Sequence, residues 1–390
     1  MRRTIFNIVD RLTFNVNKFY NFFMISKDWS YDQLRDYQLQ KLRRISDVWN
    51  LGIRSWEDFY KLPLTSKEDI FSFTPNTNRR YKTHETSGST GEPRKVYVPE
   101  ETWYRKMSIF RRSWNSLGRT DEPVLRLIAG DAKFSWYDYW RNVKALNYRK
   151  ITNEHVNYLV KEKPFLIHGP GGSTRILIEG ATLLGFDDIL KDIRIMWLGQ
   201  SSEIHKERLV DLCKSFHESY GLAELPTVAN PCLYNSHMIM ETGIVEVIDG
   251  EIIVTDFNND IMPIIRYKTG DEGKIGNNDC PCGMEHPIMY DFKGRRSDYY
   301  FGPEVRKPIG WWVVSPISHK YLHEVEKWRV DVYPKKNKFK LYVVMRTDND
   351  PNIILKDYME WVQVQIGLDC EIVERQSGFK WKRKLVRVIL

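Results

Sequence analysis

The pattern of apolar and polar positions predicts alternating helices and strands over much of the chain. The stretch up to residue 50 carries apolar side chains at helical spacing, and residues 100–117 repeat that spacing up to Gly118, so we expect helices there. The apolar runs Val124–Ile128 and Ile193–Leu198 are typical of buried strands. Segments long enough for helices separate such runs, which predicts a largely parallel α/β sheet.

The pattern changes at about residue 243. Residues 244–248 and 251–255 are strand-like runs on either side of Asp249-Gly250, a dipeptide that favours a tight hairpin turn. Closer to the C-terminus we expect a helix at 357–365, with strands at 339–344, 370–373 and 385–390. This combination predicts a small, separate α+β domain at the C-terminal end.

Two shorter segments also predict helices. Residues 209–216 place Leu, Leu, Cys and Phe at helical spacing, with Phe216 as the last apolar position of the face. Residues 62–70 form a turn that enters a short helix, for which Thr65 or Ser66 is the expected N-cap.

Charge and length narrow the possible functions without choosing one. The 390 residues are 42% hydrophobic, enough for two domains with sizeable cores. The net charge of +8 permits nucleic acids, anionic membranes or nucleotides as partners. Because the chain has no zinc-finger pattern, no RRM signature and no long basic arm, we expect no nucleic-acid partner.

The cysteines and the apolar runs bear on the compartment. Five cysteines are an odd, sparse set for this length, which argues against a disulfide scaffold and for a reducing, cytoplasmic location. No run of about 18 apolar residues occurs, so we expect no transmembrane helix. The basic, amphipathic N-terminal segment is interpreted as a helix packed on the body, with peripheral membrane contact as the alternative.

Residues 86–93 read Thr-Ser-Gly-Ser-Thr-Gly-Glu-Pro. Glycines let the backbone approach a ligand closely, and hydroxyl and N–H groups can hold a polyphosphate. The alternative is a flexible loop, as the composition alone would suggest. The candidate phosphate-binding residues are Ser87, Gly88, Ser89, Thr90 and Gly91.

Other motifs follow this loop in a fixed order. They are Tyr220-Gly221-x-x-Glu224, Pro263-x-x-Arg266-Tyr267-x-Thr269-Gly270-Asp271, Gly294-Arg295 and a basic C-terminal strand. Taken singly, each has an ordinary structural interpretation: a core tyrosine, a surface acid or a turn. Taken together, with Leu62–Asp69 and Cys280-Pro281-Cys282-Gly283, they resemble the adenylate-forming enzymes. Within that superfamily they are most similar to the phenylacetate–CoA ligase and CapK-like (capsular polysaccharide biosynthesis) branch.

The resemblance implies a reaction and a set of roles. A carboxylic acid attacks ATP to give an acyl-adenylate and pyrophosphate, and an amine, hydroxyl or thiol then takes the acyl group. The loop at 86–93 would hold the departing phosphates and Glu224 would hold Mg²⁺. Asp271 would accept hydrogen bonds from the ribose hydroxyls, and Tyr220 would lie against the adenine. Arg295 would reach the ribose or phosphate, and Gly221 is a further nucleotide-binding candidate. The catalytic residues would be Lys384, Glu224 and Arg266.

The resemblance also implies the domain organisation. Asp298 stands where the family has its hinge, which predicts an N-terminal adenylation domain over 1–298 and a C-terminal lid domain over 299–390. The lid would carry the catalytic lysine. Lys384 matches the relatives' ending, with Lys380 and Lys382 as rivals, and a solvated basic edge strand is the alternative.

Cys280 and Cys282 form one half of a possible structural Zn²⁺ site. Cys232 and His237 could supply the other two ligands, with His286 as a rival. Some relatives bear such a site. A pair of reduced, partly buried thiols is the alternative interpretation.

The identity of the substrates stays open at this stage. By analogy the acyl pocket lies between Val124 and Gly199, where His168 and the aromatics Trp136, Tyr137, Tyr139 and Trp140 are candidates to line it. We expect a small carboxylic acid and an acceptor nucleophile in surface polysaccharide biosynthesis. The alternatives are an aryl-acid CoA ligase, with CoA as acceptor, and a nucleotide-binding scaffold without catalysis.

Overall fold

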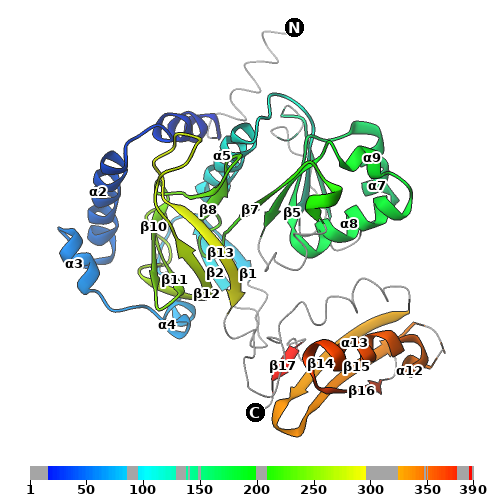
Figure 1. Cartoon of the computed structure of the whole chain (residues 1–390). Coiled ribbons are helices and arrows are strands. Elements are labelled where there is room, and N and C mark those ends of the chain that lie inside the picture. Colours follow the sequence, from blue (N-terminus) through cyan, green and yellow to red (C-terminus); the bar gives the residue numbers. More distant parts are fainter. Residues whose placement is uncertain are drawn as a thin grey trace. The chain divides into compact units, whose positions relative to one another are not determined.

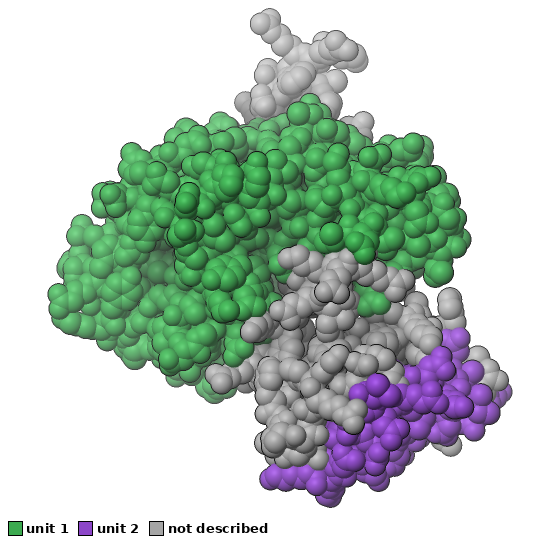
Figure 2. All heavy atoms as spheres, in the orientation of Figure 1, with its two compact units in different colours: residues 1–84, 95–294 green, residues 85–94, 295–390 purple. Residues whose placement is uncertain are grey.

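The computed structural model describes residues 16–85, 95–128, 138, 141–147, 151–198, 209–295, 324–346, 348, 350–375 and 386–388. The chain divides into two compact units (Figure 2), one of residues 1–84 and 95–294 and the other of residues 85–94 and 295–390. Residues 296–323 lie outside the described part, so the boundary expected at 298/299 stays a prediction.

The first unit begins with helices whose starts are encoded locally. A helix over residues 16–26 is followed by α2 (Tyr31–Trp49), α3 (Trp56–Lys61) and α4 (Lys67–Ser72). Each labelled helix starts with a serine whose hydroxyl accepts from the third backbone N–H, while the side chain at that third position bonds back. Ser66 caps α4, as one of the two expected N-caps.

A five-stranded, all-parallel sheet forms one half of the first unit (Figure 1). Its order is β4 (Val143–Asn147), β3 (Val124–Ile128), β5 (Leu166–Pro170), β6 (Arg194–Leu198) and β7 (Ser215–Ser219). The two apolar runs noted in the sequence are β3 and β6, and the parallel α/β sheet is confirmed.

Helices cover both faces of this sheet (Figure 1). One face packs on α7 (Asn153–Glu162), α8 (Gly171–Leu183) and α9 (Asp187–Leu190). The other face packs on α5 (Glu101–Ser116), which buries Met107, Phe110 and Trp114. The helix expected at 100–117 is therefore α5, and Gly118, where φ is +91°, directly follows its C-cap residue Leu117.

The second half of this unit is a six-stranded sheet. Its order is β10 (Gly243–Ile248), β11 (Glu251–Asp256), β12 (Tyr267–Ile275), β13 (Ile288–Arg295), β9 (Ser236–Met238) and β8 (Ala229–Pro231). A separate hairpin joins β1 (Tyr81–Glu85) to β2 (Lys95–Pro99). The expected hairpin is confirmed: Ile248 pairs with Glu251, and Asp249 and Gly250 both have positive φ.

One local prediction is wrong. The helix expected over residues 209–216 covers only 209–212, and Phe216 lies in strand β7. Phe216 pairs with Ile195 of β6 and packs in the apolar core on the α8 side. Because pairing with β6 completes the parallel sheet, the sheet contacts outweigh the local helical spacing.

The second unit contains a four-stranded sheet with its own core. The strand order is β16 (Asp369–Glu374), β15 (Lys338–Met345), β14 (Val325–Tyr333) and β17 (Val386–Val388). Helix α13 (Lys356–Ile366) contributes Tyr358 and Val362 to that core, and Leu355 joins it from between α13 and α12 (Pro351–Ile354). The helix and strands expected here are present, and β14 is an additional strand that the pattern did not reveal.

Candidate functional site

The Tyr-Gly-x-x-Glu segment leaves the carboxyl end of β7, at an edge of the parallel sheet. In open α/β sheets, ligands bind outside the carboxyl ends of the strands. The backbone of Tyr220 exchanges hydrogen bonds of 2.8 and 3.0 Å with Ala229 of β8. A Cβ on Gly221 would stand 2.2 Å from the carbonyl oxygen of Pro226, so only glycine fits this turn.

Tyr220 connects this segment to the Thr-Gly-Asp motif. Its hydroxyl donates to Oδ2 of Asp271 over 2.7 Å, and its ring stacks on Phe292 with centroids 5.3 Å apart. Burial raises the pKa of Tyr220 well above its usual value, and the neighbouring Asp271 carboxylate adds to the shift. The phenol therefore stays protonated and acts as a donor to Asp271.

Glu224 meets a residue that the motif assignment left without a role. The hydroxyl of Tyr267 donates to Oε1 of Glu224 over 3.1 Å, and both side chains are buried. Tyr267 stands between Arg266 and Asp271 in the same motif, and this position could have identified it as a site residue from the sequence. The structure thus gathers Tyr220, Glu224, Tyr267 and Asp271 at one place.

Arg266 is engaged in structural contacts. Its Nε and Nη2 bond both carboxylate oxygens of Glu246 at 3.1 and 2.8 Å, and Nη1 bonds the carbonyls of Tyr60 and Leu62. Its backbone carbonyl accepts from the N–H of Thr65, and its φ of +44° is unusual for a non-glycine residue. These contacts favour a positioning role, and the expected catalytic role stays a prediction.

Several predicted site residues lie outside the described part of the chain. These are Ser87, Gly88, Ser89, Thr90, Gly91 and Lys384. The backbone of Arg295 ends β13, but its side chain is not among those described. The aromatic candidates Trp136, Tyr137, Tyr139 and Trp140 also lie outside the described residues, whereas His168 is described.

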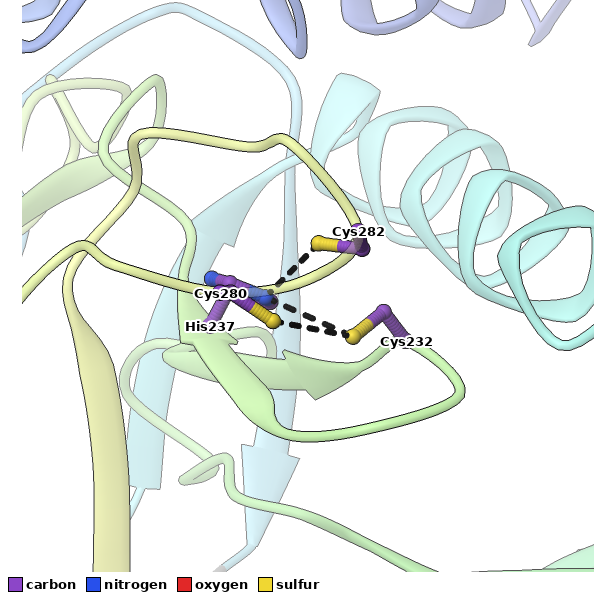
Figure 3. A group of neighbouring side chains, drawn as sticks. All are labelled: Cys232, His237, Cys280 and Cys282. Atoms are coloured by element: carbon purple, nitrogen blue, oxygen red, sulfur yellow. Dashed lines mark hydrogen bonds between the residues drawn. The ribbon is translucent and has the colours of Figure 1, made fainter.

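The structure brings Cys232, His237, Cys280 and Cys282 together (Figure 3), with all potential ligand atoms within 4.8 Å of one another. Sγ of Cys232 lies 3.8 Å from Sγ of Cys280 and 3.4 Å from Nε2 of His237. Nε2 lies 3.3 Å from Sγ of Cys282. A tetrahedral zinc with ordinary bond lengths requires separations of about 3.5–3.8 Å, so this cluster can hold such an ion.

Surrounding groups orient this cluster. Nδ1 of His237 lies 2.8 Å from the carbonyl oxygen of His286, so Nδ1 carries the proton and Nε2 is free to bind a metal. Backbone N–H groups of Tyr234 and Asn235 donate to Sγ of Cys232, and the Asn235 amide donates to Sγ of Cys280. Such donors favour the thiolate form that binds metals.

His286 is not part of the cluster. Its Nδ1 lies 2.9 Å from the carbonyl oxygen of Met238 and 3.8 Å from Oε2 of Glu241. Glu241 in turn forms a buried ion pair of 2.5 Å with Arg112. Of the two candidate histidines, the geometry selects His237.

No family model matches the chain. A phenylacetate-coenzyme A ligase of Thermus thermophilus is 24% identical over 280 residues. The alignment covers 63% of each protein, so the chain spans less than two thirds of the length of this relative.

The solved structures give the more extensive match. Crystal structures of 2-hydroxyisobutyryl-CoA ligase align over most of this chain. The postadenylation state with 2-HIB-AMP has a TM-score of 0.62 and 16% identity, over 93% of this chain and 91% of that one. The chain has the fold of the adenylate-forming ligases. The thioesterification state with 2-HIB-AMP and CoA has a TM-score of 0.56 and 16% identity, covering 97% and 89%.

Within the described residues, no helix is both long and apolar enough to span a bilayer.

Proposed function

We propose that this protein activates a carboxylic acid with ATP, forming an acyl-adenylate and releasing pyrophosphate. The observation that supports this best is the convergence of Tyr220, Glu224 and Asp271, from two motifs far apart in the sequence, at the carboxyl edge of the parallel sheet. The adenylate-forming ligase fold and the relationship to a phenylacetate-coenzyme A ligase point to the same reaction.

The roles follow from the chemistry of each side chain. Asp271 accepts hydrogen bonds from the ribose hydroxyls, and Tyr220 positions its carboxylate. Ser87 to Gly91 hold the β- and γ-phosphates, Arg295 reaches the ribose or phosphate, and Lys384 stabilises charge at the α-phosphate. Lysine and backbone donors suit this reaction because it depends on positioning and charge stabilisation.

Glu224 is the proposed Mg²⁺ ligand. Among the hydrogen bonds of the described residues, its carboxylate has a single neutral partner, the Tyr267 hydroxyl, so its charge is available to a cation. Mg²⁺ prefers hard oxygen ligands and would neutralise the charge of the ATP phosphates.

The second step of the proposed reaction transfers the acyl group to an acceptor. A CapK-like amine or hydroxyl transfer in surface polysaccharide biosynthesis remains our first proposal. Transfer to CoA is the second, because the relative at 24% identity is a phenylacetate-coenzyme A ligase. A nucleotide-binding scaffold without catalysis is the third, and the convergence of buried polar groups argues against it.

We also propose that Cys232, His237, Cys280 and Cys282 bind one structural Zn²⁺. The separations, the donors to the sulfurs and the fixed histidine tautomer all suit that ion. The ion would tie the loop that carries Cys280 and Cys282 to strands β8 and β9.

ATP–pyrophosphate exchange tests the reaction. We would measure exchange with aryl acids, uronic acids and amino acids, and then look for a thioester or amide after adding CoA or amines. Glu224→Gln and Asp271→Asn should each reduce exchange by about 10- to 1,000-fold, as expected for lost charge interactions at a reacting phosphate. Glu371→Gln, a surface carboxylate in the second unit, is the matched control. Folded protein that binds ATP but supports no exchange with any acid would favour the scaffold.

A further inference from the structure

Two basic residues occupy one row of the parallel sheet, each at the middle of its strand. Arg126 of β3 and His168 of β5 are paired Cα neighbours in the parallel register. Residues paired in this way point to the same face of a sheet. That face is the one covered by α5, because Trp114 and Phe110 of α5 both contact His168. Beside this row, apolar side chains of β3, β4, β5 and β6 pack against α5.

His168 carries a buried donor for which the described residues supply no acceptor. The indole N–H of Trp114 donates to Nδ1 of His168 over 3.3 Å, and an indole can only donate. Burial lowers the pKa of His168 well below its usual value, with Arg126 and Lys106 adding to the shift, so the imidazole is neutral and its proton resides on Nε2. His168 is only 3% exposed, and among the described residues its Nε2–H has no hydrogen-bond partner. A buried donor without an acceptor is costly, so this N–H points to a ligand oxygen that accepts from it.

Lys106 brings a further positive charge to the same place. It lies on α5 with Nζ 5.9 Å from the ring centroid of Phe110, and that ring contacts His168 at 4.4 Å. Burial lowers the pKa of Lys106 to about 8, with Arg126 contributing, so the ammonium is largely charged at neutral pH. Asp138 is the acidic partner here, 3.4 Å from Nη1 of Arg126. We call Lys106, Arg126 and His168 the basic cluster.

The basic cluster is set apart from the proposed nucleotide residues along the sheet. The strand order places β5 two strands from β7, and β3 one strand further. With strands about 4.8 Å apart, His168 and Arg126 lie roughly 10–15 Å from the edge strand that leads to Tyr220. An acid whose reacting carboxylate meets ATP beyond β7 would therefore extend its far end toward the basic cluster.

We propose that the acid activated at this site carries a second anionic group, a carboxylate or a phosphate, and that the basic cluster binds it. Arg126 and Lys106 supply charge, and Nε2–H of His168 supplies the directional hydrogen bond. This inference rests on the proposed adenylation and names the substrate class for it: an acid that is anionic at both ends.

Matched pairs of acids test this inference. Exchange would be measured with benzoate against terephthalate, octanoate against octanedioate, and glucuronate against glucuronate 1-phosphate. The third pair separates phosphate from carboxylate. We expect kcat/KM to be at least about tenfold higher for the doubly anionic member of one or more pairs, as a charged hydrogen bond would give.

Variants locate the effect. His168→Asn keeps an acceptor for Trp114 but removes the Nε2 donor. Arg126→Gln combined with Asp138→Asn removes the charge without leaving a buried carboxylate unpaired. Each should reduce the ratio of kcat/KM between the doubly anionic acid and its neutral-ended partner by about 10- to 100-fold. Arg175→Gln, which breaks an arginine–glutamate pair on α8, is the control and should leave this ratio unchanged.

Calorimetric titration of the same acids, without ATP, separates the failure of this inference from the failure of the proposed function. Equal exchange with both members of every pair would overturn the inference and leave adenylation standing. Should no acid support exchange, the adenylation proposal fails. Tighter binding of the doubly anionic acids, lost in the variants, would then still support the basic cluster, whereas equal or absent binding would overturn it.

Discussion

The hydroxyl of Tyr220 donates a 2.7 Å hydrogen bond to the carboxylate of Asp271, across 51 residues of sequence. The contact joins the segment after β7 to strand β12, so two motifs that the sequence presents separately act as one unit. Asp271 depends on this contact, because its carboxylate is buried and needs hydrogen-bond donors.

Tyr220→Phe should therefore disturb Asp271 more than the loss of one hydroxyl suggests. The ring still stacks on Phe292, but a buried carboxylate loses a donor, and we expect unfolding to become easier by about 1–3 kcal/mol. Affinity for ATP should fall about 3- to 30-fold. Urea unfolding and calorimetric titration with ATP measure the two effects, and the exposed Tyr31→Phe serves as control. Unchanged ATP affinity would contradict the proposed role of Tyr220.

Arg266 offers a test of positioning against catalysis. If Arg266 acts by holding the turn at 62–65, then Glu246→Gln, which removes its bidentate partner, should lower stability and exchange in parallel with Arg266→Lys. We expect a loss of about 2–4 kcal/mol in the free energy of unfolding for each, since a buried ion pair is broken. A large loss of exchange in Arg266→Lys, with stability intact and Glu246→Gln active, would show a direct catalytic role.

Asp256 should make stability depend on pH. Burial raises its pKa from 3.8 to about 7, opposed by the N–H groups of Asn258 and Asn259. Between these two values the folded state binds more protons than the unfolded state, so stability falls as pH rises from about 4 to about 7. Asp256→Asn keeps an acceptor for Asn258 and should raise the free energy of unfolding at pH 8 by about 2–4 kcal/mol.

The measurement for Asp256 is urea unfolding at pH 5 and pH 8. The gain from Asp256→Asn should be clearly smaller at pH 5, because the folded state then already carries the proton. The exposed Asp36→Asn is the control. An equal gain at both pH values would mean that Asp256 does not titrate in this range.

Zinc removal should affect both folding and nucleotide binding. Cys232 directly follows β8, and β8 carries Ala229, which holds the backbone of Tyr220. We expect about one zinc per chain by elemental analysis. The Cys280→Ser variant should lose this zinc, whereas Cys370→Ala should retain it. Chelation should lower the Tm and weaken ATP binding several-fold. Cobalt substitution adds an independent readout, since thiolate ligands produce a visible absorption. Metal-free protein with an unchanged Tm would rule out the structural role.

The C-terminal lysines form a matched set of variants. Lys384→Ala should reduce adenylate formation by about 100-fold or more while ATP affinity changes little, because the lysine acts on charge that develops at the α-phosphate. Lys380→Ala and Lys382→Ala should form the adenylate at close to the rate of the unsubstituted protein. Pyrophosphate release in single turnover, with ATP binding measured alongside, distinguishes the three. A loss confined to Lys382→Ala or Lys380→Ala would move the catalytic assignment to that rival.

Local features were predictable because their causes are local. Ser66 caps α4 through bonds within one turn, and Asp249-Gly250 adopts the positive φ values that its hairpin requires. The apolar runs of β3 and β6 reflect the burial of both faces of a parallel sheet. Phe216 shows the limit of this reasoning: helical spacing fitted residues 209–216, but pairing with β6 made its segment a strand.

By itself, the sequence determined the α/β class, the order of motifs and the three cysteines of the proposed metal site. Only the tertiary structure decided that His237 rather than His286 joins the cysteines, that Tyr267 accompanies Glu224, and that Arg126 stands beside His168. The reason is physical. Spacing along the chain fixes contacts within a turn or a hairpin, whereas the register between distant strands, and the burial that it creates, depends on how the whole sheet packs.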